Sequence, residues 1–457
     1  MSISTPIPGR RRRSAAGVGA HPARVIATAF AAAVVVGTAL LMLPVSRAGE
    51  GRADLLTALF HATSAVCVTG LATVDTGTYW SGFGQGVILL LIQVGGLGIM
   101  TLASLVALLL SRRLGLRARL IAQAETKSLS AADVRRVIGR VVLFSLVCEA
   151  VVATVLTARF ATAYDERPPA ALYDGVFHAV SAFNNAGFAL FSDSLMSYVT
   201  DPWITGTIAV AVIVGGLGFP VVFELLRSWR RPRSWSVLTR ITVVVTAVLL
   251  VVGTVGMLAA EGKNPDTLGG LGPGAAVLAA FVAGVMPRTA GFNNLDIGAF
   301  QPETLLLTDG LMFIGGGSAG TAGGIKVTTF GVLAYVLWAE MRGDTDVEVG
   351  RRRVPATNQR QALAVALLSV GVVAVATLVL EALTDFPFEQ VLFETVSAFA
   401  TVGLSTGITA DLPDAAQVLV VVLMFVGRIG PLTLASGLAF RQRGRRHQLP
   451  EERTIVG

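Results

Sequence analysis

The sequence predicts an all-α membrane protein with eight transmembrane helices and four re-entrant pore helices, arranged as four pseudo-symmetric repeats around one central pore. Three observations lead to this fold class. The 457-residue chain is 53% hydrophobic and only 14% charged, and its mean hydropathy is +0.69. Apolar runs that could cross a hydrocarbon layer of about 30 Å recur along it. Between those runs, a short motif ending in glycine recurs four times, which indicates repeated structural units.

Eight apolar runs are candidate membrane spans. A signal peptide is the alternative for the first run, because the four arginines Arg10 to Arg13 precede it. That run is longer than the core of a signal peptide and fits a spanning helix instead. The candidate spans are Val25–Leu43, Gly86–Leu110, Val137–Thr157, Ile204–Leu226, Val237–Ala259, Leu305–Leu337, Ala362–Leu383 and Ala416–Phe440.

Clusters of arginine stand before the first span and after every second span, so all of them lie on one side of the predicted membrane. The positive-inside rule makes that side the cytoplasm, and we expect a multi-pass protein of the bacterial plasma membrane with both termini inside. The net charge of +7 does not by itself indicate a nucleic-acid partner, because short basic clusters between spans are typical of cytoplasmic loops. Beyond Arg10 to Arg13, the clusters are Arg112, Arg113, Arg117 and Arg119; Arg227, Arg230, Arg231 and Arg233; Arg351 to Arg353; and Arg441, Arg443, Arg445 and Arg446.

These boundaries divide the chain into four repeats joined by cytoplasmic segments. Each repeat is expected to contain a helix, a re-entrant half-helix with its loop, and a second helix. The repeats are 24–112, 137–228, 237–341 and 361–440; the linkers are 113–136, 229–236 and 342–360; the cytoplasmic tails are 1–23 and 441–457.

The four outward connections contain the recurring motif. In each, phenylalanine stands ten positions before a glycine, and in three of them serine stands six positions before it. A second, glycine-rich landmark follows each motif in the same order, which makes a chance match improbable. The motifs are Phe60–Gly70, Phe177–Gly187, Phe281–Gly291 and Phe393–Gly403, followed by Gly95–Gly98, Gly215–Gly218, Gly315–Gly317 and Gly427–Gly430.

A loop at membrane depth is tolerated only where it is buried in protein or lines a water-filled cavity. Carbonyl oxygens from four such loops can replace the hydration shell of a monovalent cation, and they offer nothing to an anion. We therefore predict a selectivity filter for a monovalent cation, with one acid beyond each glycine drawing cations to an outer vestibule. The filter candidates are Cys67, Val68, Thr69 and Gly70; Asn184, Asn185, Ala186 and Gly187; Arg288, Thr289, Ala290 and Gly291; and Ala400, Thr401, Val402 and Gly403; the vestibule acids are Asp75, Asp193, Asp296 and Asp411.

The sixth span contains the glycine-rich run Gly315–Gly324. A continuous helix is unfavourable there, since each glycine costs about 1 kcal/mol relative to alanine. The run matches the dinucleotide pattern G-x-G-x-x-G, but no strand precedes it and it lies inside a membrane segment. We predict a mobile loop, spanning 315–325, in the permeation path. Arg428 is expected to hold this loop through carbonyl contacts, because a charge in the middle of a span is expensive. The gate candidates are Gly315, Gly316, Gly317, Ser318, Ala319, Gly320, Thr321, Ala322, Gly323, Gly324, Lys326 and Arg428, with interface snorkelling the alternative for Lys326.

The four loop sequences resemble the filter loops of the Trk/Ktr/HKT superfamily of potassium transporters. The segments that carry this resemblance are Thr63–Leu71, Phe183–Phe188, Arg288–Asn294 and Ser397–Leu404, and it extends from about residue 24 to 440. The chain is most similar to the membrane subunits of bacterial Ktr systems, because no extra helix pair precedes the first repeat. The resemblance implies K⁺ uptake by a homodimer with one pore per subunit, Na⁺ stimulation, gating by an intramembrane loop, and regulation by a cytoplasmic KtrA-type RCK ring that binds ATP or ADP.

Several other interpretations receive less support. His61 and His178 occupy equivalent positions and could suggest a metal site, but pore-helix packing explains them better because convergent ligands are missing. Glu149 and Glu381 could relay protons, although neither has an obvious acidic partner. The pattern of an enzyme active site is absent from the sequence, so we expect no enzyme. An alternating-access transporter for an organic solute is the main rival, and a membrane-anchored scaffold is a third reading.

Overall fold

The computed structural model describes residues 22–113, 131–350 and 352–440. The arginine clusters at 10–13 and 441–446, the residues Arg117 and Arg119, and Arg351 lie outside the described residues, as do most of the predicted tails and of the linker 113–136.

The described chain is almost entirely helical. Its strands are β1 (Glu348–Val349) and β2 (Arg352–Arg353), an antiparallel pair in which Glu348 faces Arg353. The helices are α1 (Pro22–Leu41), α2 (Leu55–Cys67), α3 (Thr76–Tyr79), α4 (Gly82–Arg113), α6 (Ala131–Ala163), α7 (Pro168–Phe183), α8 (Pro202–Leu217), α9 (Phe219–Ser228), α10 (Val237–Glu261), α11 (Pro273–Val285), α12 (Pro302–Phe313), α13 (Val327–Arg342), α14 (Ala356–Leu383), α15 (Phe388–Ala400) and α16 (Asp414–Phe440).

Four of these helices are long and apolar enough to cross a membrane, within the residues described: α4, α6, α10 and α14. The pair α8 and α9 adds a fifth span if the two are counted together. Three further predicted spans coincide with α1, with the pair α12 and α13, and with α16. The break after Phe313 leaves α12 and α13 individually too short to span.

The prediction of one continuous helix over Ile204–Leu226 is wrong. The chain bends by 101° between α8 and α9. Gly218 stands at the bend with φ 88° and ψ 141°, a conformation that only glycine adopts without strain. Pro220 follows inside the first turn of α9, where its missing N–H costs nothing. The sequence contained both residues, but Gly218 had been interpreted only as part of the recurring glycine-rich landmark.

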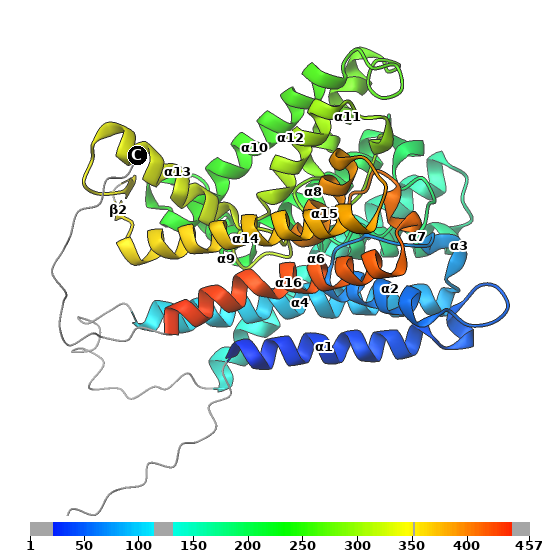
Figure 1. Cartoon of the computed structure of the whole chain (residues 1–457), viewed down its shortest axis with the longest axis horizontal. Coiled ribbons are helices and arrows are strands. Elements are labelled where there is room, and N and C mark those ends of the chain that lie inside the picture. Colours follow the sequence, from blue (N-terminus) through cyan, green and yellow to red (C-terminus); the bar gives the residue numbers. More distant parts are fainter. Residues whose placement is uncertain (1–21, 114–130, 351, 441–457) are drawn as a thin grey trace, which may run out of the picture.

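The long helices lie side by side, with shorter helices packed among them. Figure 1 shows α1, α4, α14 and α16 with nearly parallel axes, and neighbouring members of this group are in contact. Each of the short helices α2, α7, α11 and α15 packs against the long helix that precedes it in the chain. The same local arrangement therefore occurs four times in the described chain.

The outward faces of the long helices are apolar. Val35, Leu90, Val151, Val255 and Val375 are each between 58% and 68% exposed. Large apolar side chains at that exposure would be costly in water, but they are ordinary on a face that meets lipid.

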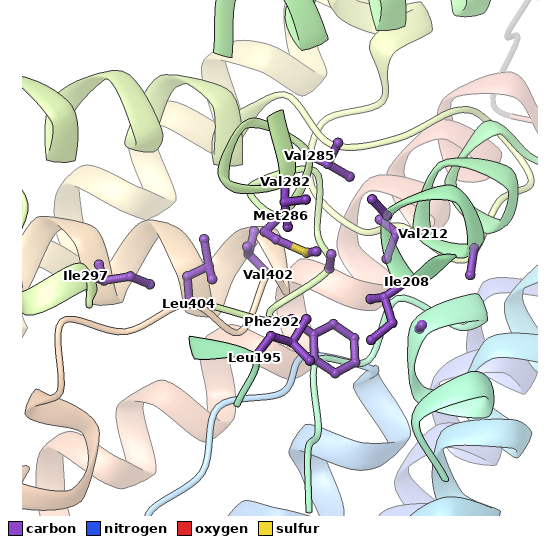
Figure 2. Close-up of a cluster of buried hydrophobic side chains, with 14 of the residues drawn as sticks. Leu195, Ile208, Val212, Val282, Val285, Met286, Phe292, Ile297, Val402 and Leu404 are labelled. Atoms are coloured by element: carbon purple, nitrogen blue, oxygen red, sulfur yellow. The ribbon is translucent and has the colours of Figure 1, made fainter. Parts of the chain in front are cut away.

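The largest buried cluster joins the second, third and fourth motif regions. Figure 2 shows Val282 and Met286 of the third region close to Val402 of the fourth, with Phe292, Ile208 and Leu195 beside them. Burial of these side chains fixes the glycine loops relative to one another.

Candidate functional site

The four predicted filter segments share one backbone conformation. After each short helix, the residue two positions ahead of the motif glycine is in the left-handed region: Val68, Asn185, Thr289 and Thr401, with φ between 51° and 64°. The glycines themselves have φ of 97° at Gly70, 71° at Gly187, 75° at Gly291 and 94° at Gly403. Left-handed residues other than glycine are strained and persist only where the surroundings hold them. Four such residues at equivalent positions indicate a built site.

The four motif glycines meet in a closed ring. A Cβ placed on Gly187 would lie 2.7 Å from the Cα of Gly291, and one on Gly291 would lie 2.5 Å from the carbonyl oxygen of Val402. A Cβ on Gly403 would lie 3.0 Å from the Cα of Gly70, and one on Gly70 would lie 3.1 Å from the Cα of Gly187. Each glycine therefore faces the backbone of the next repeat, and no side chain fits between them. The nearest oxygens belong to the residues just before the glycines: Thr69, Ala186, Ala290 and Val402.

The recurrent serine stabilises this loop in two repeats. The Gly70 N–H donates to Ser64 Oγ at 3.0 Å, and the Gly403 N–H donates to Ser397 Oγ at 3.1 Å. In the second repeat, Ser181 Oγ donates instead to the Phe188 carbonyl at 2.7 Å. The third repeat has Val285 at this place. The serines of the motif are therefore loop-closing residues.

A side-chain network braces the second loop from behind. Asn184 Nδ2 donates to Gln93 Oε1 at 2.8 Å and to Glu149 Oε1 at 3.2 Å, and Gln93 Nε2 donates to both Glu149 oxygens. Glu149 was considered only as a proton relay in the sequence. Its observed partners are two amides, which tie α4 and α6 to the loop after α7.

In three repeats, the side chain nine residues before the motif glycine connects the short helix to the segment that follows the loop. His61 and His178 bond backbone groups there, which agrees with the packing role predicted for them. Glu394, the equivalent residue of the fourth repeat, accepts two hydroxyl bonds. Val282 cannot form such a bond, and Asn294 replaces it. The contacts are His61 Nε2 to Val74 O (3.3 Å), Leu190 N to His178 Nε2 (3.3 Å), Ser405 Oγ to Glu394 Oε2 (2.9 Å), Thr409 Oγ1 to Glu394 Oε1, and Asn294 Nδ2 to Ala279 O (3.0 Å).

The glycine-rich segment between α12 and α13 lies directly against the loops. Thr321 Oγ1 donates to Asn185 Oδ1 at 2.8 Å, and a Cβ on Gly323 would lie 2.6 Å from the Ala400 carbonyl oxygen. The segment is also bonded to α8, because Gly317 N–H donates to Gly216 O at 2.7 Å and Thr321 N–H donates to Gly215 O at 3.2 Å. It therefore contacts the second and fourth loops and the end of α8 together.

Two buried arginines hold this segment at different points. Arg428 Nη1 donates to the Thr321 carbonyl at 2.5 Å, and Arg288 Nη2 donates to the Gly315 carbonyl at 3.0 Å. The two residues are only 4% and 6% exposed, and neither has an acidic partner among the described residues. Lys326 Nζ donates to the Ala322 carbonyl within the same segment.

The sequence missed one of these two arginines. Arg288 had been assigned to the filter for its carbonyl oxygen, and that assignment stays a prediction. The oxygen accepts a bond from Asn185 Nδ2 at 3.4 Å, and the bond from the side chain to Gly315 was not expected. The informative signal was the arginine side chain itself, since an isolated charge in an apolar re-entrant motif needs a buried acceptor.

Three of the four predicted vestibule acids take part in local turns. Asp75 accepts from Thr78 N–H, Asp193 from Ser197 N–H, and Asp296 from Gly298 N–H. Burial raises the pKa of Asp75, but hydrogen bonds from Ser192 and Thr78 outweigh it and leave the pKa below its ordinary value. Asp411 is exposed. A role in attracting cations stays a prediction for all four.

The fold and the site together define a class: a multi-pass helical membrane protein in which the loops after four short helices form one ring of glycines. Such a ring presents backbone oxygens and excludes side chains, which suits contact with a dehydrated cation.

Comparisons with known proteins point to a particular family. The model of the TrkH family, described as cation transport protein, matches residues 14–442. The chain is 41% identical to the Ktr system potassium uptake protein B of Bacillus subtilis (strain 168), over 92% of this chain and 93% of that protein. It is 40% identical to the protein of the same name from Vibrio alginolyticus, over 95% and 94% of the two chains. The crystal structure of the potassium transporter TrkH from Vibrio parahaemolyticus has the same fold, with a TM-score of 0.71 at 18% identity over 93% of this chain and 86% of that one.

The chain therefore belongs to the TrkH family of cation transport proteins. The resemblance seen in the four loop sequences is confirmed. Because this family consists of transporters, the expectation that the chain is not an enzyme is confirmed as well.

Proposed function

We propose that this protein takes up K⁺ across the bacterial plasma membrane through a filter formed by the backbone oxygens at the glycine ring. The observation that carries the proposal is the closure of that ring, in which each of four glycines faces the backbone of the next repeat. Relatives named as potassium uptake proteins, at about two-fifths identity over nearly the full chain, support K⁺ as the ion.

The surroundings of the ring favour a cation. The short helices α2 and α15 end directly at filter residues, so their negative dipole ends face this region. The carbonyl oxygens of Thr69, Ala186, Ala290 and Val402 are the oxygens closest to the ring. In this proposal they replace the water around K⁺, and four pseudo-symmetric repeats surround a single pore.

The segment from Gly315 to Gly324 is the proposed gate. It contacts loop residues of two repeats and is held by single hydrogen bonds from Arg288 and Arg428. Its backbone bonds to Gly215 and Gly216 tie it to α8. Opening requires these bonds to exchange for others, which a glycine-rich backbone permits at low steric cost.

The remaining parts of the proposal rest on family membership. They are eight transmembrane helices, the predicted repeat and linker boundaries, cytoplasmic termini, a homodimer, stimulation by Na⁺, and regulation by a cytoplasmic KtrA-type RCK ring that binds ATP or ADP. The outer acids complete the account as a vestibule that concentrates cations.

Rb⁺ uptake in cells that lack their own K⁺ uptake systems tests the proposal. Gly70→Ala should reduce uptake at least a hundredfold, because φ of 97° strains alanine and its Cβ would overlap the Ala186 carbonyl. Gly206→Ala is the matched control, since a Cβ at that helical position meets nothing within 4 Å.

The proposal predicts that excess K⁺ competes with Rb⁺ in the unchanged protein and that Gly206→Ala transports normally. Uptake of an organic solute without competition between K⁺ and Rb⁺ would reject it in favour of an alternating-access transporter. Equal Rb⁺ uptake by the Gly70→Ala and Gly206→Ala proteins would reject the ring as the filter.

A further inference from the structure

The helix α9 turns away from the axis of α8 almost at a right angle. It bends by 101° from α8 at Gly218, and Pro220 lies in its first turn. If α8 crosses the bilayer, as expected of an apolar helix in a multi-pass membrane protein, α9 lies along the membrane surface. Helices in that orientation place their apolar side chains at the boundary between headgroups and acyl chains.

The exposed residues of α9 and its connection to α10 suit this boundary. Phe223, Leu226 and Trp229 follow one another at intervals of three residues and are 37%, 68% and 63% exposed. The spacing puts them on neighbouring turns of one helix side. Three large apolar groups in a row are unfavourable in water and favourable against lipid tails.

Four arginines lie beside these apolar groups. Arg227, Arg230, Arg231 and Arg233 are all exposed, and none of them forms an ion pair within the described chain. The Arg230 guanidinium lies over the Trp229 ring, 4.7 Å from its centroid. Arg227, Arg230 and Arg231 line a surface hollow together with Phe223, Leu226 and Trp229.

The acid in this hollow has other partners. Glu224 accepts bonds from the Ser236 N–H, Ser236 Oγ and Thr239 Oγ1, each at 2.6 Å. These bonds close the turn between α9 and α10. The arginines are therefore left with positive charge that the described residues do not neutralise.

We infer that α9 and the turn after it form a binding site for an anionic phospholipid of the cytoplasmic leaflet. Arg227, Arg230 and Arg231 bind the phosphate-bearing headgroup, while Phe223, Leu226 and Trp229 contact the upper acyl chains. A soluble partner would match the charge but would leave the three apolar groups unexplained, whereas a lipid satisfies both.

The site is directly connected to the segment proposed as the gate. Gly218, where α9 begins, is packed so closely that its Cβ would lie 3.0 Å from the Gly320 nitrogen. Two residues earlier, Gly216 O accepts the Gly317 N–H at 2.7 Å. Lipid binding that fixes the angle of α9 therefore changes how firmly the gating segment is held. This coupling rests on the proposed function, whereas lipid binding does not.

Lipid retention by the full-length protein tests the binding. The purified protein is reconstituted with phosphatidylcholine alone or with added phosphatidylglycerol, and the lipid that stays bound is measured by native mass spectrometry. The variant Arg227→Gln/Arg230→Gln/Arg231→Gln should retain about tenfold less phosphatidylglycerol, because each basic residue contributes to anionic-lipid affinity. The control variant Arg342→Gln/Arg353→Gln/Arg360→Gln removes the same charge from other exposed positions and should retain it normally.

Rb⁺ flux into the same vesicles tests the coupling. Phosphatidylglycerol should change flux through the unchanged and control proteins, and it should leave flux through the α9 variant unaffected. Equal lipid retention by the two triple variants overturns the inference, as does an α9 variant that keeps the lipid and loses a cytoplasmic protein partner. If retention behaves as expected and none of the proteins transports Rb⁺, the proposed function fails and the lipid site stands.

Discussion

The first and third repeats follow the same chain path, but they differ in how the loop is closed and in whether the following helix is continuous. In the first repeat, Ser64 closes the loop onto Gly70, and the following helix α4 is continuous. In the third repeat, Val285 replaces the serine, and Arg288 reaches from the loop to Gly315. The helix that follows is divided into α12 and α13. The comparison teaches that one unit can contribute its loop alone to the ring, whereas an equivalent unit also contributes the segment proposed as the gate.

The largest change in Rb⁺ uptake is expected at Arg428, which binds the segment proposed as the gate. Arg428→Gln removes a charge-assisted bond to Thr321 and a buried positive charge close to the proposed cation path. Hydrogen bonds to charged groups contribute about 1.5–3 kcal/mol, so we expect Rb⁺ uptake to rise about tenfold. Uptake is measured beside Arg342→Gln, an exposed arginine on α13. Unchanged uptake by the Arg428 variant would remove that residue from the gate.

A smaller increase is expected at the arginine that belongs to the third repeat itself. Arg288→Gln removes the single bond to Gly315, which at 3.0 Å is longer than the 2.5 Å bond of Arg428, so Rb⁺ uptake should rise less, about threefold. The double variant with Arg428→Gln should show less than the product of the two effects, because both arginines hold one segment. Fully multiplicative effects would mean that the two residues act on separate elements.

The difference in loop closure predicts a difference in selectivity. Ser64→Ala leaves the Gly70 N–H without its acceptor, at a cost of about 1 kcal/mol. We expect the ratio of Rb⁺ to Na⁺ uptake to fall about fivefold. Val285→Ala at the equivalent place in the third repeat should preserve the ratio, since no loop bond depends on that side chain. A similar fall in both variants would show that the two loops are closed alike.

The smallest effect is expected on stability, at the turn in which Asp75 accepts from the Thr78 N–H. The folded-state pKa of Asp75 lies below its ordinary value, so its contribution to stability is present above about pH 4 and is lost as the pH falls through the folded-state pKa. The melting temperature of Asp75→Asn should therefore fall below that of the unchanged protein at pH 6, and the gap should narrow towards pH 3. A gap that is constant across this range would contradict the assignment.

The sequence was informative at the four motif glycines, which act through the backbone. A position that requires positive φ is usually occupied by glycine, which is visible in the sequence. Four glycines at equivalent positions predicted which segments come together. The partners of polar side chains could not be predicted in this way. Glu149 meets Asn184 across 35 positions of sequence, and Arg288 meets Gly315 across 27. These contacts depend on how the helices pack, which periodicity and composition do not determine.

The bend at Gly218 is a second feature that the sequence did not predict. Gly218 and Pro220 were visible in the sequence, but the apolar run across them has the length of one span. The bend places Gly216 and Gly218 beside the segment proposed as the gate, a contact that the sequence does not reveal.

Anomalous scattering from Rb⁺ soaked into crystals of the protein tests the account most directly. We predict a peak on the axis of the ring, bounded by the carbonyl oxygens of Thr69, Ala186, Ala290 and Val402, which decreases when K⁺ is added. A ring without a peak, in crystals where Rb⁺ binds elsewhere in the membrane region, would contradict the claim that these four loops form the filter.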